Sequence, residues 1–171
     1  VKADYSIKKL AYNELEIAKQ LVDSSYDRNE VSKRDLAYYQ ALYQHFGDAI
    51  EFLVVYHKDK TPISTGVFIH HPNELVYFMS GADSEYRHLY GGHFLQHYVM
   101  SRAIASGVKR YNFYGVSGHF EKNPLLVYKS GFRGTIEEYV GGFTYIANPG
   151  KHLVRRALRV PKAAARKILG R

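Results

Sequence analysis

Three strand-like segments in a row, at residues 51–56, 62–70 and 74–80, constrain the fold more than any other feature. Each is rich in β-branched and aromatic residues, and short polar turns separate them. They therefore predict an antiparallel meander. Residues 91–106 follow with apolar residues at helical spacing and a closing Gly107, which predicts a helix packed on that sheet. The expected buried stripe of this helix comprises Phe94, Leu95, Tyr98, Val99 and Ala103.

The segments on either side of the meander predict a mixed sheet with helices on both faces, which is an α/β fold. Asn13 is the expected N-cap of the first helix. In chain order, the remaining predicted elements are a strand at 4–10, helices at 13–24 and 33–46, a strand at 110–115, a short helix after it and a strand at 135–146.

Length and composition favour one compact domain over residues 1–150. The chain has 171 residues and 46% hydrophobic content, enough for a core but short for two average domains. It contains no cysteine, which excludes a disulfide framework and a thiolate metal site and fits a reducing cytosol. No apolar run is long enough to span a bilayer and no signal peptide opens the chain. Because its first residue is Val1, we interpret it as a fragment or a processed chain.

Positive charge is concentrated at the end of the chain. Residues 1–150 contain 16 Lys or Arg and 16 Asp or Glu, so the net charge of +8 belongs to residues 151–171. The basic residues of this tail are Lys151, Arg155, Arg156, Arg159, Lys162, Arg166, Lys167 and Arg171. Apolar residues at helical spacing, interrupted by Pro161, predict a basic amphipathic helix with a break. A surface for tRNA phosphates, an anchor on anionic membranes and a solvated terminal helix stay open as interpretations.

Lys129 is the charged residue that most needs an explanation. It lies between two strand-like runs and is surrounded by Leu125, Leu126, Val127 and Phe132. Apolar neighbours limit the hydration of its ammonium, so a negative charge that develops during a reaction could use it. A lysine that extends from the edge of a core to water is the other interpretation.

Several sequence blocks, taken in order, resemble the FemABX family. They are SKRDLAYYQALYQHFGD, LYGGHFLQHYVMSRAIASG, KRYNFYGVSG, YKSGF and EEYVGGF, and together they cover roughly residues 28–147. Members of this family are aminoacyl-tRNA-dependent transferases that build the peptide cross-bridges of bacterial peptidoglycan. The resemblance implies two tandem domains of the GNAT (acetyltransferase-like) fold in such enzymes, and this chain is similar to the second.

The resemblance also implies a reaction and its partners. An amino acid would pass from aminoacyl-tRNA to a lysine-type amine on the stem peptide of a nucleotide-linked or lipid-linked precursor, without a cofactor. The first GNAT-like domain of the same enzyme is an expected partner. The expected location is cytoplasmic, with peripheral contact with the anionic inner face of the membrane left open.

Site residues follow from the resemblance one at a time. Lys129 is implied to be catalytic, through stabilisation of the tetrahedral oxyanion. Arg34, Tyr38 and Tyr77 are implied to bind the acceptor, and the first two lie four apart on a predicted helix, so they would share a face. For each tyrosine, burial in the core is the alternative.

A glycine-containing turn precedes the predicted helix at 91–106. Arg87, Gly91 and Gly92 are candidates for binding an anion or a tRNA phosphate at this helix N-terminus. Tyr90 stands where the acetyltransferase pattern has its first glycine, which argues against an acetyl-CoA site. Glycines that permit close packing on the sheet are the alternative.

Two other functions and a metal site complete the alternatives. A single-domain N-acetyltransferase and a non-catalytic fragment that binds tRNA or the precursor both fit the predicted fold. His93 and His97 are four apart on a predicted helix, but no third ligand stands at a telling spacing, so no metal is expected.

Overall fold

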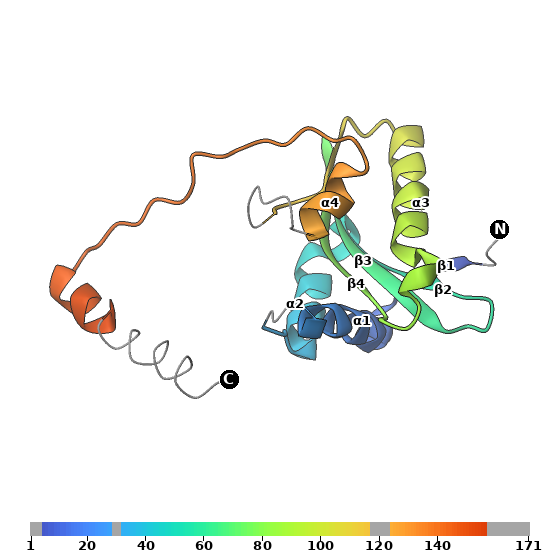
Figure 1. Cartoon of the computed structure of the whole chain (residues 1–171), viewed down its shortest axis with the longest axis horizontal. Helices are drawn as coiled ribbons and strands as arrows, with labels where there is room; N and C mark the ends of the chain where they lie inside the picture. Colours follow the sequence, from blue (N-terminus) through green and yellow to red (C-terminus); the bar gives the residue numbers. More distant parts are fainter. Residues whose placement is uncertain (1–4, 29–31, 117–123, 157–171) are drawn as a thin grey trace. The chain divides into compact units, whose positions relative to one another are not determined.

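The computed structural model describes residues 5–28, 32–116 and 124–156 (Figure 1). By its internal contacts the chain divides into two units, residues 1–132 and 133–171, which we describe separately. The prediction of one domain over residues 1–150 stays a prediction.

A five-stranded mixed sheet forms the centre of the first unit. Its strands, in spatial and chain order, are β1 (Ser6–Lys9), β2 (Ile50–Tyr56), β3 (Pro62–His71), β4 (Glu74–Ala82) and β5 (Arg110–Asn112). The first four are antiparallel neighbours, whereas β5 runs parallel to β4. The predicted meander is therefore confirmed, and so is the mixed α/β sheet.

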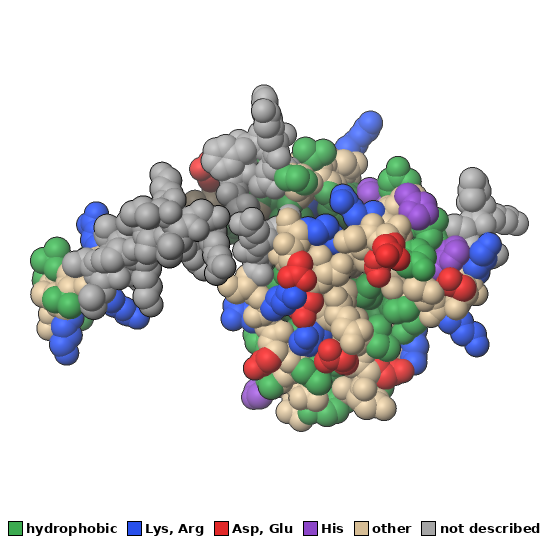
Figure 2. Space-filling view, turned by 60° about the horizontal axis from the view of Figure 1, so that its bottom comes forward, with side chains coloured by type: hydrophobic (Ala, Val, Ile, Leu, Met, Phe, Trp, Pro, Cys, Tyr) green, Lys and Arg blue, Asp and Glu red, His purple; other side chains and the backbone are tan. Residues whose placement is uncertain are grey.

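Helices on both faces of the sheet enclose two apolar cores (Figure 1). In chain order they are η1 (Tyr12–Glu14), α1 (Leu15–Arg28), α2 (Leu36–Phe46), η2 (Gly47–Ala49), η3 (Arg87–Leu89), α3 (Gly91–Ala105) and α4 (Pro124–Ser130). Side chains of α1 and α2 pack with Phe52 and Val67 of the sheet. Side chains of α3 pack with Leu53 and Phe68, which lie on the other face. Over the first unit, Figure 2 shows basic and acidic side chains interspersed.

Two helix starts differ from the prediction. Asn13 lies inside η1 and does not cap a helix; instead the carboxylate of Glu14 accepts a hydrogen bond from the backbone N–H of Ala11 at 3.1 Å. Asp35 caps α2 by accepting from the backbone N–H of Tyr38 at 3.0 Å. An aspartate at this position satisfies an N–H that the first turn leaves free. Arg34 therefore precedes α2 and is not part of it.

The prediction was wrong for one residue of the buried stripe on α3. Tyr98 is 40% exposed, and its ring lies 5.6 Å from the guanidinium carbon of Arg102 on the outer face of the helix. Gln96 is buried in its place, with no exposed area. A tyrosine carries an apolar ring and can still be stabilised at the surface by a cation, so apolar spacing alone misassigned it.

The parallel pairing of β4 and β5 is short. It joins Glu74 to Arg110, Leu75 to Tyr111 and Val76 to Asn112, and it ends there although β4 continues to Ala82. Just beyond this point β4 carries a bulge, because Tyr77 and Met79 face successive residues of β3 and Phe78 is left over. The backbone that follows β5 therefore needs hydrogen-bond partners other than β4.

The second unit, as far as it is described, contains no strand. Residues 135–146, predicted as a strand, have no regular secondary structure, and residues 149–156 are helical. Several large apolar side chains here are exposed, namely Tyr139, Val140, Phe143, Tyr145, Leu153 and Val154. The strand prediction was wrong for this structure because a strand needs a neighbour for its backbone groups. Arg155 and Arg156 are exposed on the helical part, while Arg159 and the rest of the tail lie outside the described residues.

Gly81 provides a test of how α1 packs on β4. A Cβ atom at this position would lie 2.2 Å from the backbone oxygen of Leu21, and a backbone cannot move as a side chain can. We expect Gly81→Ala to lower the free energy of unfolding by about 2–3 kcal/mol in urea titrations. Gly92→Ala is the matched control, because its Cβ would meet Tyr128 Oη at an ordinary 3.5 Å. A change of less than about 1 kcal/mol is expected there, and equal effects of the two variants would contradict the packing.

Candidate functional site

Lys129 joins α4 to the chain that leaves β5. Its ammonium donates hydrogen bonds to the backbone oxygens of Phe113, at 2.5 Å, and Gly115, at 2.8 Å. Both carbonyls follow the point where β5 stops pairing with β4. The lysine therefore supplies donors where the sheet no longer does.

The environment of Lys129 is partly desolvated. Burial lowers the pKa of its ammonium below the ordinary value. Among the described residues, no carboxylate lies within ion-pair distance of it. An ammonium has three N–H groups, and the two carbonyls take two of them. Among the described residues no third acceptor contacts it, so one donor is left for another acceptor.

Aromatic rings hold α4 against the first turn of α3. The ring of His93 lies 5.0 Å from Tyr128 and stacks on Phe132 at 5.9 Å. Phe132 also packs on Phe113 at 5.1 Å. His93 thus acts as an aromatic packing residue. Within the described ranges, no group of three His, Cys, Asp or Glu side chains could hold a metal ion.

A buried polar cluster lies beside this aromatic contact, and the sequence analysis missed most of it. It consists of Tyr77, Gln96, Tyr111 and Tyr128, from β4, α3, β5 and α4. The hydroxyl of Tyr111 donates to Oε1 of Gln96. Neither Nε2 of Gln96 nor the hydroxyl of Tyr128 has a hydrogen-bond partner among the described residues.

Burial keeps the phenols of this cluster protonated. It raises the pKa of Tyr77, Tyr111 and Tyr128 above the ordinary tyrosine value. Tyr77 is only 6% exposed, with its ring stacked on Phe68 at 5.3 Å. It lies in the core, so its implied contact with the acceptor stays a prediction. A glutamine within an apolar helical stripe was the one sequence signal for the cluster.

Arg34 and Tyr38 lie together although Arg34 is outside the helix. The guanidinium carbon of Arg34 lies 5.4 Å from the ring centre of Tyr38, a cation–π contact. Arg34 is exposed, and Tyr38 packs against the core under α1 and α2. Tyr128, next to Lys129, packs against the core on the α3 face. Arg34 and Tyr38 therefore lie beside one core and Lys129 beside the other, and the structure shows no contact between them.

The turn before α3 combines strain with close packing. Tyr90 has a φ of 55°, a left-handed conformation that favours glycine, which is the residue of the acetyltransferase pattern. A Cβ at Gly91 would lie 2.9 Å from Ile63, so this glycine permits α3 to approach β3. Arg87 is exposed in η3. The pKa of Arg28 is lowered mainly by burial and next by the charge of Arg87. Arg28 also donates a hydrogen bond to the backbone oxygen of Ala82 at 3.2 Å.

Comparisons with known proteins agree with one another. The model of the FemAB family matches residues 5–58 and 54–159. The aminoacyltransferase FemA of Staphylococcus epidermidis is 36% identical over 107 residues, which are 60% of this chain and 26% of FemA. This chain thus spans about a quarter of the length of that relative.

Solved structures show the same fold at low sequence identity. The crystal structure of FemX superposes with a TM-score of 0.63 and 13% identity, over 71% of this chain and 47% of FemX. A possible acetyltransferase of Clostridium difficile superposes with a TM-score of 0.67 and 10% identity, over 84% of this chain and 99% of its own. The sheet is therefore GNAT-like, as the resemblance implied.

The hydrogen bond between Tyr111 and Gln96 can be tested by a double-mutant cycle. Gln96→Leu leaves the buried hydroxyl of Tyr111 without its acceptor, so we expect the free energy of unfolding to fall by about 1–3 kcal/mol. Tyr111→Phe leaves Oε1 of Gln96 without this donor and should cost less, because a buried carbonyl oxygen without a partner is tolerated better than a buried donor. The double variant should be more stable than the sum of the single effects predicts, by about 1 kcal/mol. Additive effects in urea titrations would show that the two side chains are not coupled.

Proposed function

Because this chain belongs to the FemAB family, we propose that it transfers an amino acid from aminoacyl-tRNA to a side-chain amine on the stem peptide of a peptidoglycan precursor. The aminoacyl ester is already activated, so the reaction needs no nucleophilic residue of the enzyme. It needs alignment of the amine, removal of its proton and stabilisation of the tetrahedral oxyanion.

The geometry of Lys129 is the observation that carries this proposal. Two backbone carbonyls bind the ammonium, and no other described residue takes its third N–H donor. A positive charge held in place before the reaction stabilises an oxyanion without reorganisation, and partial burial strengthens that effect. Lys129 is therefore the proposed catalytic residue. The proton of the attacking amine is proposed to pass to the substrate itself.

Arg34 and Tyr38 are the proposed grip on the acceptor. The exposed guanidinium has free donors that match a pyrophosphate or a carboxylate, and the ring of Tyr38 limits its motion. Tyr77 is buried beside Tyr128. Its proposed effect on acceptor binding is through the shape of this core.

A first GNAT-like domain of the same enzyme is the proposed partner of this chain. The exposed apolar side chains of residues 133–156 support this partner, because water is an unfavourable neighbour for so many of them. The FemA relative is about four times as long as the matched segment, which leaves room for such a domain.

The proposed location is the cytoplasm, where charged tRNA is found. No helix among the described residues has the length and apolar character to cross a bilayer. Contact of the basic residues Lys151, Arg155 and Arg156 with anionic lipid stays an alternative to contact with tRNA.

A single-domain N-acetyltransferase is the second candidate. The acetyltransferase-like structure matched over 99% of its length favours it, and the tyrosine at position 90 opposes it. The decisive experiment follows a radiolabelled amino acid from charged tRNA to the muramyl pentapeptide, with and without an added first domain of a FemA relative. Acetyl-CoA turnover without aminoacyl transfer would replace the proposed function by this alternative.

Lys129→Met should lower the rate of aminoacyl transfer by about 10²- to 10³-fold, as loss of one oxyanion donor does in other enzymes. Lys58→Met, in the exposed turn after β2, is the control and should leave the rate unchanged. Near-ultraviolet circular dichroism of both variants verifies that α4 keeps its aromatic packing. Equal turnover of the Lys129 variant and the unmodified chain would remove Lys129 from the mechanism.

The pH profile tests the charge on Lys129 separately. Burial lowers its pKa, so the ammonium should lose its proton at a lower pH than an exposed lysine does. Transfer should therefore decline as pH rises through that lowered pKa. Lys129→Arg keeps its charge over the whole range, so the rate of the unmodified chain relative to this variant should fall with rising pH. A constant ratio would contradict a role for the charged form.

Arg34→Ala should weaken binding of the nucleotide-linked pentapeptide by about tenfold or more, because a charged hydrogen bond contributes about 1.5–3 kcal/mol. Isothermal titration calorimetry measures the affinity for the pentapeptide. Filter binding measures the affinity for tRNA, and the affinity for tRNA should not change. Lys33→Ala, one residue earlier and also exposed, is the matched control. An unchanged acceptor affinity in Arg34→Ala would sink the proposed grip.

A further inference from the structure

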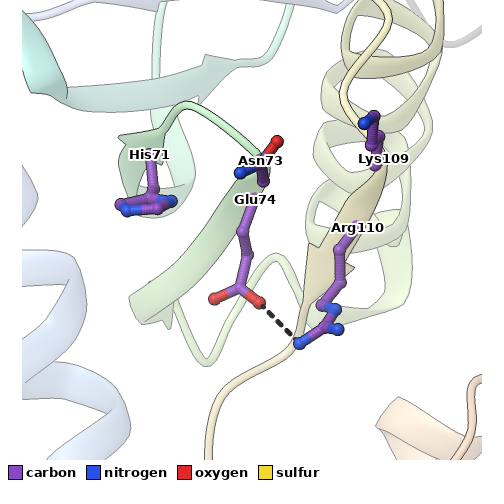
Figure 3. A pocket seen from close by; sticks show the side chains of 5 residues that line it. All are labelled: His71, Asn73, Glu74, Lys109 and Arg110. Atoms are coloured by element: carbon purple, nitrogen blue, oxygen red, sulfur yellow. Dashed lines mark ion pairs between the residues drawn. The ribbon is translucent and has the colours of Figure 1, made fainter.

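A polar pocket opens where β4 and β5 begin, at the other end of β5 from the Lys129 contacts. It has a volume of about 460 Å³ and is lined by His71, Asn73, Glu74, Lys109 and Arg110 (Figure 3). Glu74 and Arg110 are the first residues of β4 and β5, and Asn73 and Lys109 come directly before them. None of these residues takes part in the proposed transfer.

Neighbouring strands fix the guanidinium of this pocket. Glu74 and Arg110 are directly paired residues, and Figure 3 shows their side chains pointing toward each other, with 3.5 Å between Oε2 and Nη1. Asn112 donates to the other carboxylate oxygen of Glu74 at 3.1 Å. Arg110 is nevertheless 65% exposed. The carboxylate is thus neutralised from within the sheet, and the guanidinium keeps free N–H groups.

The other lining side chains add unused donors. Within the described part of the chain, the side chains of His71, Asn73 and Lys109 form no hydrogen bond or ion pair, and those of His71 and Lys109 are exposed. An ammonium and an amide both donate, so the pocket offers donors in excess of its single, already paired carboxylate. The ligand that suits this set carries a negative charge and several acceptor oxygens, as a phosphodiester does.

An exposed aromatic ring continues the surface along β5. Arg110 and Asn112 alternate along β5, so they project to one side of the sheet, and Tyr114 lies two residues beyond the strand. Tyr114 is 59% exposed and packs edge-on against Phe78 of β4, with 5.5 Å between ring centres. The backbone N–H of Tyr114 donates to Oδ1 of Asn112 at 2.7 Å. A cation, an amide and an exposed aromatic ring, at positions 110, 112 and 114, are the elements with which sheets bind single-stranded RNA.

We infer that Lys109, Arg110, Asn112 and Tyr114 bind a single RNA strand, with phosphates in the basic pocket and a base on the ring of Tyr114. This inference rests on the proposed function, which supplies an RNA whose single-stranded 3′ end carries the amino acid. Tyr114 lies between Phe113 and Gly115, whose carbonyls hold Lys129. In this inference the 3′ end of the strand lies at Tyr114, next to the carbonyls that bind Lys129, and the preceding phosphates lie at Lys109 and Arg110.

The test measures binding of an uncharged, fluorescein-labelled single-stranded RNA to the full chain by anisotropy over a range of salt concentrations. The double variant Lys109→Gln/Arg110→Gln should bind at least about tenfold more weakly, and the slope of log K against log salt should flatten by roughly 1.4, which corresponds to two lost phosphate contacts. Tyr114→Asn should weaken binding by about fivefold or more and leave the slope unchanged, because stacking carries no charge. Asparagine suits the left-handed backbone of this position, where φ is 60°.

Lys58→Gln/Lys60→Gln is the matched control, since it removes the same charge from the exposed turn between β2 and β3. An equal loss of affinity in this control would show nonspecific attraction and overturn the inference. Unchanged RNA binding by either test variant would overturn it as well. So would test variants that lose binding to anionic vesicles but keep their binding to RNA. No aminoacyl transfer is measured, so failure of the proposed reaction alone would leave the RNA result unaffected.

Discussion

The divergence of β5 from β4 is the constraint on which the candidate site depends. Three paired residues join the two strands, and the chain then leaves the sheet with its carbonyls exposed to other partners. Lys129 binds two of those carbonyls and is partly buried in doing so. The same contact therefore stabilises the end of β5, positions α4 and holds an ammonium whose third donor has no acceptor among the described residues. A fully paired strand would have left neither the opening nor a reason to bury the lysine.

Packing beneath α4 determines how rigidly that ammonium is held. His93, Tyr128 and Phe132 interlock α4 with the first turn of α3, and Phe113 extends the contact to the chain after β5. Gln96 and the phenols around it lie in the same region, with two polar atoms unpaired among the described residues. Aromatic packing alone would be the more stable solution, because an unpaired buried donor is costly.

The sequence predicted the meander and the helix at 91–106 because each has a local cause. Alternation, helical periodicity and a closing glycine all act within a few residues. Tyr98 was expected to be buried, but it lies at the surface beside the cation of Arg102 on the next turn. Gln96 is buried, and Tyr111 of β5 donates a hydrogen bond to it. The strand expected at 135–146 depends on a neighbour that no local pattern encodes. The basic pocket was missed for the same reason, since only strand register brings Glu74 and Arg110 together.

Two tyrosines near α4, Tyr90 and Tyr114, have strained backbone conformations. Tyr90 and Tyr114 both adopt left-handed conformations, which cost a bulky residue of order 1–3 kcal/mol. Tyr90 begins α3 and packs on His93, which in turn contacts α4. Tyr114 lies between the carbonyls that bind Lys129 and presents its ring to solvent. Glycine would relieve the strain at either position but would remove an aromatic ring. The strain therefore coincides with an aromatic contact at each position, to His93 at Tyr90 and to Phe78 at Tyr114.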